Sequence, residues 1–483
     1  MVFIHIILTL IQTLGVQSSV IILPSIGEAL DIPASRQQWI VSSYALTFGC
    51  FLLLWGRLAD VYGKRLVFIL GCAWFALMSL ITPFVPNEIG FDVIRALQGL
   101  GAAANVPTAL GILGQTIPPS KAKNMAFACY GAGAPLGSIF GNIIGGVIAQ
   151  YLSWKWVFWV ISIMAALVTV ASFVVIPPPP PHIVEMQRQN SAKASVDWIG
   201  GTLVTVGLLA LMFALTEGNV VGWSTPWIPA LIVISIILIV LFAVWQWYLE
   251  TKTTRPPLMK ISIWKNSRFA AAQIIMAFFF ASFNNYLIFV TYYYQDYQGL
   301  SPIQTTLRFI PTGVVGCVTA LTTGLLMSKI RGNHIVLFGT FCVSLSVLLF
   351  AVPIPTSTSY FAYGLPAMVL AVFGADTVYP CLTLFTAQSL PSTDQALGGA
   401  LINAVGQIGR AIGLAIATAV QTSVIAADKH QSVDAVGKLV FEHHDPSFLK
   451  GLRAGNWLSF AFGMVACVVV AVAFRGTGKL GKK

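Results

Sequence analysis

Residues 56–65 read GRLADVYGKR, a short charged turn that joins two long apolar segments. A related turn, GLLMSKIRG at 324–332, stands 268 positions later between two further apolar segments. In both copies another glycine, Gly71 or Gly339, follows fifteen residues after the first glycine of the turn. Two related halves, each with a basic glycine turn between apolar spans, are the layout of a secondary transporter.

The composition excludes a soluble globular protein. Hydrophobic residues make up 57% of the 483-residue chain and charged residues only 9%, whereas charged residues are about 25% of a typical soluble domain. A spanning helix needs about 20 mostly apolar residues. The sequence therefore predicts an all-α polytopic membrane protein with about fourteen transmembrane helices, at roughly 2–24, 38–56, 66–85, 89–115, 125–150, 155–176, 197–216, 226–249, 268–295, 303–328, 334–353, 359–387, 397–426 and 453–474.

The excess of positive charge, +11 at pH 7, is concentrated in alternate loops. Of the 27 Lys and Arg residues, three lie inside spans, six lie in loops opposite the 56–65 turn, and the other 18 lie on the side of that turn. Because cytoplasmic loops of membrane proteins are enriched in Lys and Arg, this distribution predicts that the turn and both termini are cytoplasmic. The charge therefore reports membrane topology, and no nucleic-acid partner is expected.

Five successive prolines at 177–181 interrupt the chain, because proline cannot continue a helix. The two halves on either side match beyond the turn, since Gly101 and Pro107 of the fourth span correspond to Gly374 and Pro380 of the twelfth. We predict a six-helix bundle at 1–176, a Pro-rich cytoplasmic linker at 177–196, two additional spans at 197–250, a basic loop and second six-helix bundle at 251–474, and a short basic cytoplasmic tail at 475–483.

Three motifs together resemble the signatures of the major facilitator superfamily. They are the turn at 56–65, RALQGLG at 95–101 in the fourth span and GSIFGNIIGG at 137–146 in the fifth. Fourteen spans in a 6+2+6 arrangement are similar to the drug:proton antiporter branch, and QSS at 17–19 and WKWVF at 154–158 resemble its fungal members. The resemblance implies the major-facilitator fold, with two six-helix bundles and two extra central spans.

In that fold the first and fourth spans of each half line a central cavity, which here implies spans 1, 4, 9 and 12. Sparse polar groups among Phe and Tyr on these spans suit an amphipathic organic solute. The candidate cavity residues, with one from the thirteenth span, are Gln17, Gln98, Asn105, Asn284, Asn285, Tyr286, Tyr379 and Arg410.

The sequence departs from the family pattern at three positions. Val61 stands where the turn usually has a basic residue, and Asn142 stands where the antiporter motif usually has proline. Gly15 occupies the position at which the fourteen-span branch often has an aspartate, which argues against a proton-carrying carboxylate in the first span.

Charged side chains inside the hydrocarbon are candidates for function, because each costs at least about 2.5–3.5 kcal/mol to insert. Asp376 is the only carboxylate deep in a span, with Tyr379 and Thr383 on the same helical face. Burial disfavours the charged form of a carboxyl, which would suit Asp376 to carry a proton. The alternatives are a static ion pair with Arg410 on the next helix and a site with neither role.

Arg95 shares one stripe of the fourth span with Asp92, Gln98 and Asn105. The resemblance implies a role for this arginine in proton coupling. The alternative is that Arg95 snorkels to the outer surface or pairs with Asp92. For Arg308, near an outer end, we expect a structural pair with Asp296 instead of a functional role.

Two glycine motifs have both a structural and a functional interpretation. In the 56–65 turn, glycines permit a tight reversal, and the acidic residue can latch an inner gate by pairing with a basic group or a helix N-terminus; a purely topological turn is the alternative. In the fifth span, glycines at every fourth position favour close helix packing, and the resemblance implies control of leak. The gating motif comprises Gly56, Asp60, Gly63, Lys64 and Arg65, and the helix-packing motif comprises Gly137, Gly141, Asn142, Gly145 and Gly146.

Several classes of site lack support in the sequence. The seven cysteines have no paired spacing, so we interpret them as small core residues. The histidines of the predicted outer loop 427–452, His430, His443 and His444, show no recurring ligand spacing, so no metal site is predicted. No GxxxxGK[ST] loop supports ATP-driven transport. No cofactor is predicted, and no nucleophile–base pair indicates an enzyme.

These features favour a secondary active transporter that exports small amphipathic organic compounds (drugs, toxins or metabolites) in exchange for protons by alternating access. Its partners would be the solute, protons and the lipid bilayer, and it would act as a monomer in the plasma membrane, with the vacuolar membrane as the alternative. A second hypothesis is uptake or export of a narrow-specificity solute, ion or metal chelate. A transporter-like nutrient receptor ranks lower, because only the short segment 475–483 follows the last predicted span.

Overall fold

The structure is a computed structural model that describes residues 2–32, 36, 37, 39–117, 120–176, 196–355, 357–391, 395–436, 441–475 and 478. The predicted Pro-rich linker, apart from Val196, and the predicted tail, apart from Arg475 and Gly478, lie outside these residues. Fourteen of the described helices are long and apolar enough to cross a membrane. The predicted all-α, fourteen-span architecture is therefore confirmed.

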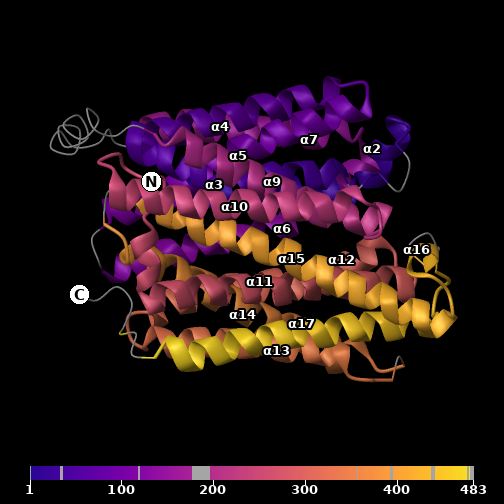
Figure 1. Cartoon of the computed structure of the whole chain (residues 1–483). Helices are drawn as coiled ribbons and strands as arrows, with labels where there is room; N and C mark the ends of the chain where they lie inside the picture. Colours follow the sequence, from indigo (N-terminus) through magenta and orange to yellow (C-terminus); the bar gives the residue numbers. More distant parts are fainter. Residues whose placement is uncertain are drawn as a thin grey trace. The chain divides into compact units, whose positions relative to one another are not determined.

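Figure 1 labels the helices in chain order. The first are α1 (Val2–Ile21), α2 (Leu23–Ala29), α3 (Trp39–Tyr62), α4 (Lys64–Ile81), η1 (Thr82–Phe84), α5 (Glu88–Thr116), α6 (Lys121–Tyr151) and α7 (Lys155–Val175). Next come α9 (Trp198–Val221), α10 (Trp227–Lys252) and η2 (Ile261–Lys265). The last are α11 (Ser267–Tyr292), η3 (Tyr293–Tyr297), α12 (Pro302–Leu326), α13 (Gly332–Ala351), α14 (Tyr360–Gln388), α15 (Gln395–Lys429), α16 (Val433–Val436) and α17 (Pro446–Ala473).

The chain forms two compact units, each assembled from separate segments. The first unit comprises Met1–Leu211, Leu231–Phe269 and Thr383–Ala404, and the second comprises Met212–Ala230, Ala270–Leu382 and Val405–Lys483. The end of α14 and the start of α15 belong to the first unit, and the predicted bundle at 251–474 stays a prediction.

Local sequence explains where several helices begin. Gly63 separates α3 from α4 with φ of +101°, a conformation that favours glycine and allows the tight reversal. Ser301 begins α12 in a capping box with Gln304, and the side chain of Asp445 caps α17.

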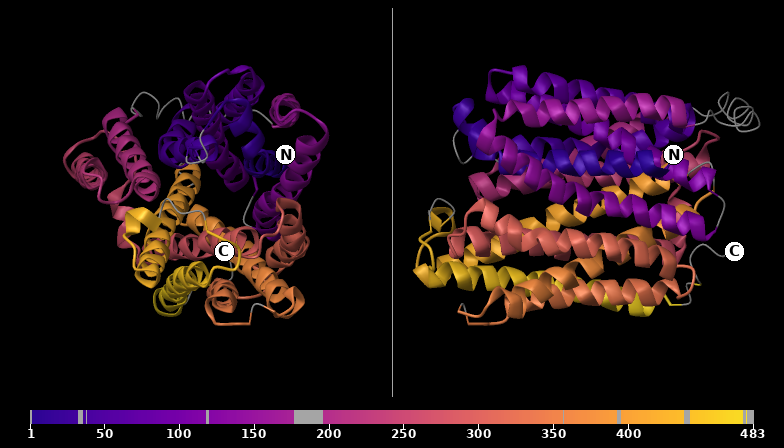
Figure 2. Two further views of the ribbon diagram at one scale, coloured as in Figure 1. Left: turned by 90° about the vertical axis from the view of Figure 1, so that its right-hand side faces the viewer. Right: turned by 180° about the vertical axis from the view of Figure 1, so that it is seen from behind.

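In the first unit α4 packs against both α5 and α7, and α1 packs along α6. Figure 2 draws the helices from two further sides. Fully buried phenylalanines fill the spaces between these helices, among them Phe91 of α5 and Phe158 of α7, whose ring centroids are 5.8 Å apart. This packing positions the polar residues of α5 described below.

In the second unit α13 packs along α17. Phe350, near the end of α13, is surrounded by tyrosine rings of α11, η3 and α14 at centroid distances of 5.4–6.1 Å. The π-helical turn η3 contributes two of these tyrosines, Tyr293 and Tyr294.

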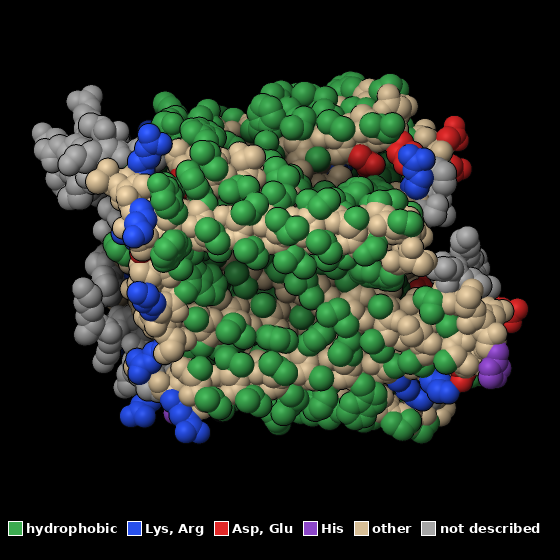
Figure 3. All heavy atoms as spheres, viewed as in Figure 1, with side chains coloured by type: hydrophobic (Ala, Val, Ile, Leu, Met, Phe, Trp, Pro, Cys, Tyr) green, Lys and Arg blue, Asp and Glu red, His purple; other side chains and the backbone are tan. Residues whose placement is uncertain are grey.

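The surface of α10 is hydrophobic. Val233, Ile237, Val240 and Val244 are among its exposed side chains, and the only basic residue of its last turn is Lys252. Figure 3 shows hydrophobic side chains along this helix and Lys and Arg side chains at helix ends. A helix whose exposed side chains are largely apolar suits a lipid environment.

Candidate functional site

Asp60, near the end of α3, joins two other elements of the first unit. Its Oδ1 lies 2.8 Å from Nζ of Lys64 in α4, and its Oδ2 accepts a 3.0 Å hydrogen bond from the backbone N–H of Leu397 in the first turn of α15. The side chains of Lys64 and Asp60 are 5% and 2% exposed. A helix N-terminus favours a negative charge, so both bonds favour the ionised carboxylate. The turn at 56–65 is thereby tied to the start of α15.

Glycines let α15 approach the helices of this unit closely. A Cβ added at Gly56 would lie 2.6 Å from Cβ of Ala400, and one at Gly111 would lie 2.9 Å from Cβ of Ala396. Both distances are shorter than ordinary contacts, so a larger residue would push α15 away. Gly56 belongs to the predicted gating motif, whereas no sequence pattern distinguished Gly111 from the other glycines of its span.

Arg65, the last residue of the gating motif, has different partners. Its Nε and Nη2 donate hydrogen bonds to the carbonyl oxygens of Ile176 and Phe173, both at 2.7 Å, at the end of α7. Its guanidinium also lies 5.3 Å from the centroid of the Phe173 ring. A cation at a helix C-terminus is favourable, so Arg65 anchors α7 and does not join the Asp60 ion pair.

Arg95 of α5 is 1% exposed, and its hydrogen bonds go to uncharged groups. Its Nε donates a 2.9 Å hydrogen bond to the carbonyl oxygen of Ile40, and its Nη1 donates one of 2.5 Å to Oε1 of Gln98. The guanidinium lies 5.0 Å from the centroid of the Tyr44 ring. Among the described residues it forms no ion pair with Asp92, and its burial rules out snorkelling to the surface in this structure.

Gln98 and Asn105, the other polar residues of this stripe, both contact α4. Gln98 donates a 2.6 Å hydrogen bond to Oγ of Ser79. Oδ1 of Asn105 lies 3.6 Å from Sγ of Cys72, and a Cβ at Gly71 would be only 2.4 Å from the same oxygen. Both side chains are fully buried, so they lie inside the first unit.

Gln17 and the glycines of the fifth span lie where α1 meets α6. Nε2 of Gln17 donates a 2.7 Å hydrogen bond to Oγ of Ser138. Gly146 has no neighbour within 4 Å of an added Cβ, and Asn142 is half-buried. At the remaining three positions a Cβ would lie 2.4–2.9 Å from a backbone atom of α1, and these positions are Gly137, Gly141 and Gly145. Close packing against α1 therefore requires glycine at these three positions.

The neighbouring polar residues of α11 have different surroundings. Asn285 is fully buried, and its Nδ2 donates to the carbonyl oxygen of Gly413 at 3.0 Å and to Oγ of Ser459 at 3.2 Å. Tyr286 is also fully buried and contacts Sδ of Met368 at 3.5 Å. Asn284 is half-buried and lies one helical turn from Phe280, on the same face of α11.

Asp376 of α14 is 7% exposed. Within the part of the chain that the structure describes, it forms no ion pair, and its Oδ2 accepts no hydrogen bond. Cys317 of α12 lies close enough to interact with it electrostatically. The static ion pair with Arg410 that the sequence left open is not formed here.

Arg410 of α15 packs against an aromatic ring. Its Cζ lies 4.1 Å from the ring centroid of Phe280 in α11, and the ring of Tyr379 meets Phe280 edge-on at 6.1 Å. Nε of Arg410 is buried and has no hydrogen-bond partner among the described residues. Gly406, one turn earlier, leaves room for the ring, since an added Cβ would lie 2.9 Å from Cδ2 of Phe280. No sequence pattern pointed to Phe280 as the partner of Arg410.

Arg308 of α12 also has aromatic partners. Its Cζ lies 4.6 Å from the Tyr294 ring centroid and 5.5 Å from that of Tyr360, and its Nη1 donates a 2.7 Å hydrogen bond to Oε1 of Gln298. The described residues contain no ion pair between Arg308 and Asp296, so the expected partner was wrong. The π-helical turn η3 brings Tyr294, in place of Asp296, to the guanidinium.

Asp197, directly before α9, is a buried carboxylate outside the predicted site. It accepts hydrogen bonds from the backbone N–H of Gly200 at 2.9 Å, from Nε1 of Trp245 at 3.0 Å and from Nε2 of Gln246 at 2.6 Å. These bonds tie the start of α9 to α10. An aspartate directly before an apolar run is a helix-capping signal, which could have identified it from the sequence.

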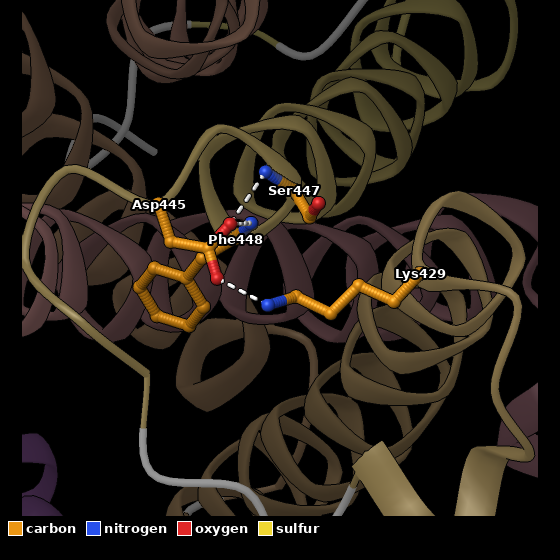
Figure 4. Close-up of polar contacts among 4 residues, drawn as sticks. All are labelled: Lys429, Asp445, Ser447 and Phe448. Carbon is orange, nitrogen blue, oxygen red and sulfur yellow. Dashed lines mark hydrogen bonds and ion pairs between the residues drawn. The ribbon is translucent and has the colours of Figure 1, made fainter.

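An ion pair fastens the predicted outer loop (Figure 4). Nζ of Lys429 lies 2.5 Å from Oδ2 of Asp445, whose Oδ1 accepts hydrogen bonds from the backbone N–H groups of Ser447 at 2.8 Å and Phe448 at 3.4 Å. Partial burial acts to raise the pKa of Asp445, but the bonds from Lys429 and the backbone outweigh it and lower the pKa below its ordinary value. In the described part of the chain, no group of three or more His, Cys, Asp or Glu side chains could hold a metal ion.

Comparisons with known proteins agree with this architecture. Residues 6–414 match the family model described as Major Facilitator Superfamily. The chain is 32% identical over 396 residues to the low affinity ammonium transporter of Saccharomyces cerevisiae, covering 81% of this chain and 75% of that protein. It is 30% identical over 443 residues to the major facilitator superfamily multidrug transporter mdr3 of Aspergillus fumigatus, covering 91% and 72%. The solved structure of the proton:xylose symporter XylE matches with a TM-score of 0.68 at 13% identity, covering 100% of this chain and 96% of that one, which shows a shared fold.

Proposed function

This chain belongs to the major facilitator superfamily, a family of transporters and not of enzymes, and we propose that it exports small amphipathic organic compounds in exchange for protons. The observation that carries the proposal is Asp376, a buried carboxylate with no ion pair among the described residues. Such a carboxyl can gain and lose a proton without breaking a structural ion pair. The similarity to the multidrug transporter mdr3 supports export of organic compounds.

Protons entering the cell would drive the exchange. Each proton that moves down ~100 mV supplies about 2.3 kcal/mol, before any contribution from a pH gradient. We assign Arg95 to proton coupling and not to solute binding. Its Nε and Nη1 already donate hydrogen bonds within the first unit, to Ile40 and Gln98.

Alternating access requires contacts that form in one state and break in another. We propose that the 56–65 turn is such a contact, on the cytoplasmic side together with both termini. The bonds from Asp60 to Lys64 and to the Leu397 amide support this role. A hydrogen bond to a charged group contributes about 1.5–3 kcal/mol, which biases a two-state equilibrium without making it irreversible. We propose a monomer in the plasma membrane, with the vacuolar membrane as the alternative.

The contacts of the candidate cavity residues indicate which of them we propose to bind the solute. Gln17, Gln98, Asn105, Asn285 and Tyr286 already contact neighbouring helices of their own units. We therefore propose that these five position helices. The proposed solute contacts are Asn284, Tyr379 and Arg410.

Dye transport into proteoliposomes under an imposed proton gradient tests the proposal. Two flat dyes of opposite charge, rhodamine 123 and carboxyfluorescein, cover both charge classes. The wild type should move at least one of them, and Asp376→Asn should move neither under the gradient. Asp197→Asn is the matched control, because it makes the same change at a buried carboxylate outside the proposed proton path.

Two results would contradict the proposal. A folded wild type that moves neither dye would exclude broad export of amphipathic compounds. Gradient-driven transport by Asp376→Asn at the wild-type rate would remove this carboxylate from the coupling path.

A second candidate function is transport of a narrow-specificity ion or solute. The 32% identity to the low affinity ammonium transporter favours it, as do the departures from the antiporter pattern at Gly15 and Asn142. Currents induced by ammonium on a supported membrane, without movement of either dye, would favour this candidate. Dye transport without an ammonium current would favour the exporter.

A further inference from the structure

We propose that the solutes of this transporter are organic anions, and that Arg410 binds their acidic group while Phe280 and Tyr379 contact their flat apolar part. This inference rests on the proposed function, because it names the substrate class of the same transporter. It follows from the hydrogen-bonding groups that Arg410 leaves unused.

The contact with Phe280 occupies one face of the Arg410 guanidinium, with Cζ 4.1 Å from the ring centroid. A guanidinium is planar and carries its five N–H donors at its edge, so stacking consumes none of them. In the described residues no hydrogen bond or ion pair reaches this side chain, and its Nε is buried. The edge is therefore available for two parallel hydrogen bonds to a carboxylate or sulfonate group.

The other two arginines inside spans differ on this point. Arg95 uses Nε and Nη1 on Ile40 and Gln98, with only its Nη2 left without a partner among the described residues, and Arg308 uses Nη1 on Gln298. Arg410 is half-buried with a buried Nε that has no partner in the described residues, which is unfavourable for a cation, and binding of an anion would relieve this cost. Of the three, Arg410 is the one whose side chain makes no hydrogen bond among the described residues, so it has the most donors to offer an anionic ligand.

The aromatic platform beside Arg410 is held in place. Phe280 is 8% exposed, and its ring fits above Gly406, where an added Cβ would approach to 2.9 Å. Tyr379 borders the ring edge-on at 6.1 Å. A fixed ring beside free guanidinium donors matches a solute in which an aromatic or other flat group carries the acid.

Asp376 does not neutralise this positive charge. It belongs to the same unit, yet no ion pair joins it to Arg410 in the residues described. The site therefore keeps a net attraction for anions and repels cations of the same shape.

Calorimetric titration of the purified protein in nanodiscs, without a proton gradient, tests the inference. The probes are 2-naphthalenesulfonate and (2-naphthylmethyl)trimethylammonium, which share a ring system and carry permanent, opposite charges. We expect the wild type to bind the sulfonate at least about tenfold more tightly. Arg410→Gln should weaken sulfonate binding by about 10–100-fold, and binding of the ammonium probe should stay equal or become tighter, because the repelling charge is removed. Arg410→Lys should bind the sulfonate with an affinity between that of the wild type and that of Arg410→Gln.

Arg308→Gln is the matched control, because Arg308 also stacks on aromatic rings in the same unit. It should leave the preference for the sulfonate unchanged. The inference is overturned if the wild type prefers the ammonium probe, or if Arg410→Gln keeps the wild-type preference. If Arg410→Gln does not fold, Arg410→Lys takes its place as the test. An affinity of Arg410→Lys for the sulfonate equal to that of the wild type would also overturn the inference. If the wild type transports a dye but binds the two probes equally, only this inference is contradicted. If the wild type transports neither dye, the proposed export function is contradicted.

Discussion

Charges inside the spans of the two units are held in different ways. In the first unit, Arg95 donates to Ile40 and Gln98 and is almost completely enclosed. In the second, Arg410 and Asp376 form no hydrogen bond to a charged partner and no ion pair among the described residues. Hydrogen bonds to a charge inside a span stabilise it, whereas a charge that makes none lowers stability and is a candidate for function. The comparison separates residues that hold the transporter together from residues that bind what it moves.

The largest effect is expected at the carboxylate without an ion pair. Asp376→Asn keeps the shape of the side chain but cannot take up a proton, so gradient-driven transport should fall to background. Exchange of solute at equal concentrations on both sides should continue, because it needs no net proton movement. Measuring both activities in one proteoliposome preparation checks this. If Asp376→Asn loses both gradient-driven transport and solute exchange, or keeps both, the assignment of Asp376 to proton coupling and not to solute binding is contradicted.

The second largest effect is a difference in stability between substitutions of Arg95 and of Arg410. Arg95→Leu removes two hydrogen bonds and leaves buried acceptors unpaired, so we expect a loss of about 2–4 kcal/mol. Arg410→Leu removes mainly a cation–π contact and also a desolvated charge, so its effect should stay within about 1 kcal/mol. Unfolding titrations in mixed micelles measure both values. Equal losses in the two variants would remove the basis of the comparison.

A smaller effect is expected for the satisfied carboxylate of the first unit. Asp60→Asn weakens the bond that protects the Leu397 amide, so exchange of that amide with solvent should accelerate by about 10–100-fold. Lys64→Met breaks the ion pair but leaves the hydrogen bond to the amide, so its effect should be smaller. An unchanged exchange rate in Asp60→Asn would contradict the proposed latch.

The smallest effect concerns the more exposed pair of Asp445 and Lys429. The pKa of Asp445 is lowered, so the stabilisation is complete above its ordinary pKa of about 3.9 and is lost as pH falls through the lowered pKa. Protection of the Ser447 amide, corrected for intrinsic exchange, should therefore decrease on acidification below about pH 4. Asp445→Asn should abolish this pH dependence, and its persistence would assign the change to another group.

The helices could be predicted from the sequence because their signals are local. Apolar length marks the spans, and Gly63 and the capping residues mark where helices begin. Asp60 meets both kinds of partner that the sequence suggested, a basic side chain and a helix N-terminus.

The partners of the buried arginines could not be predicted in this way. Arg95 reaches Ile40 on α3, and Arg410 reaches Phe280 on α11, and both contacts depend on tertiary packing. Arg308 shows the consequence most clearly, because the π-helical turn η3 replaces its expected acidic partner with Tyr294. Helical spacing alone places a charge in a span and leaves open whether its hydrogen bonds are satisfied.

The most direct test of the account measures two quantities in the same two variants. These are the equilibrium affinity for 2-naphthalenesulfonate and the gradient-driven flux, in Arg95→Lys and Arg410→Lys. The account predicts that Arg95→Lys keeps the affinity and loses the flux, whereas Arg410→Lys loses affinity about tenfold and recovers flux at saturating solute. If both variants lose the same quantity, or if their effects are reversed, the assignment of coupling to Arg95 and solute binding to Arg410 is contradicted.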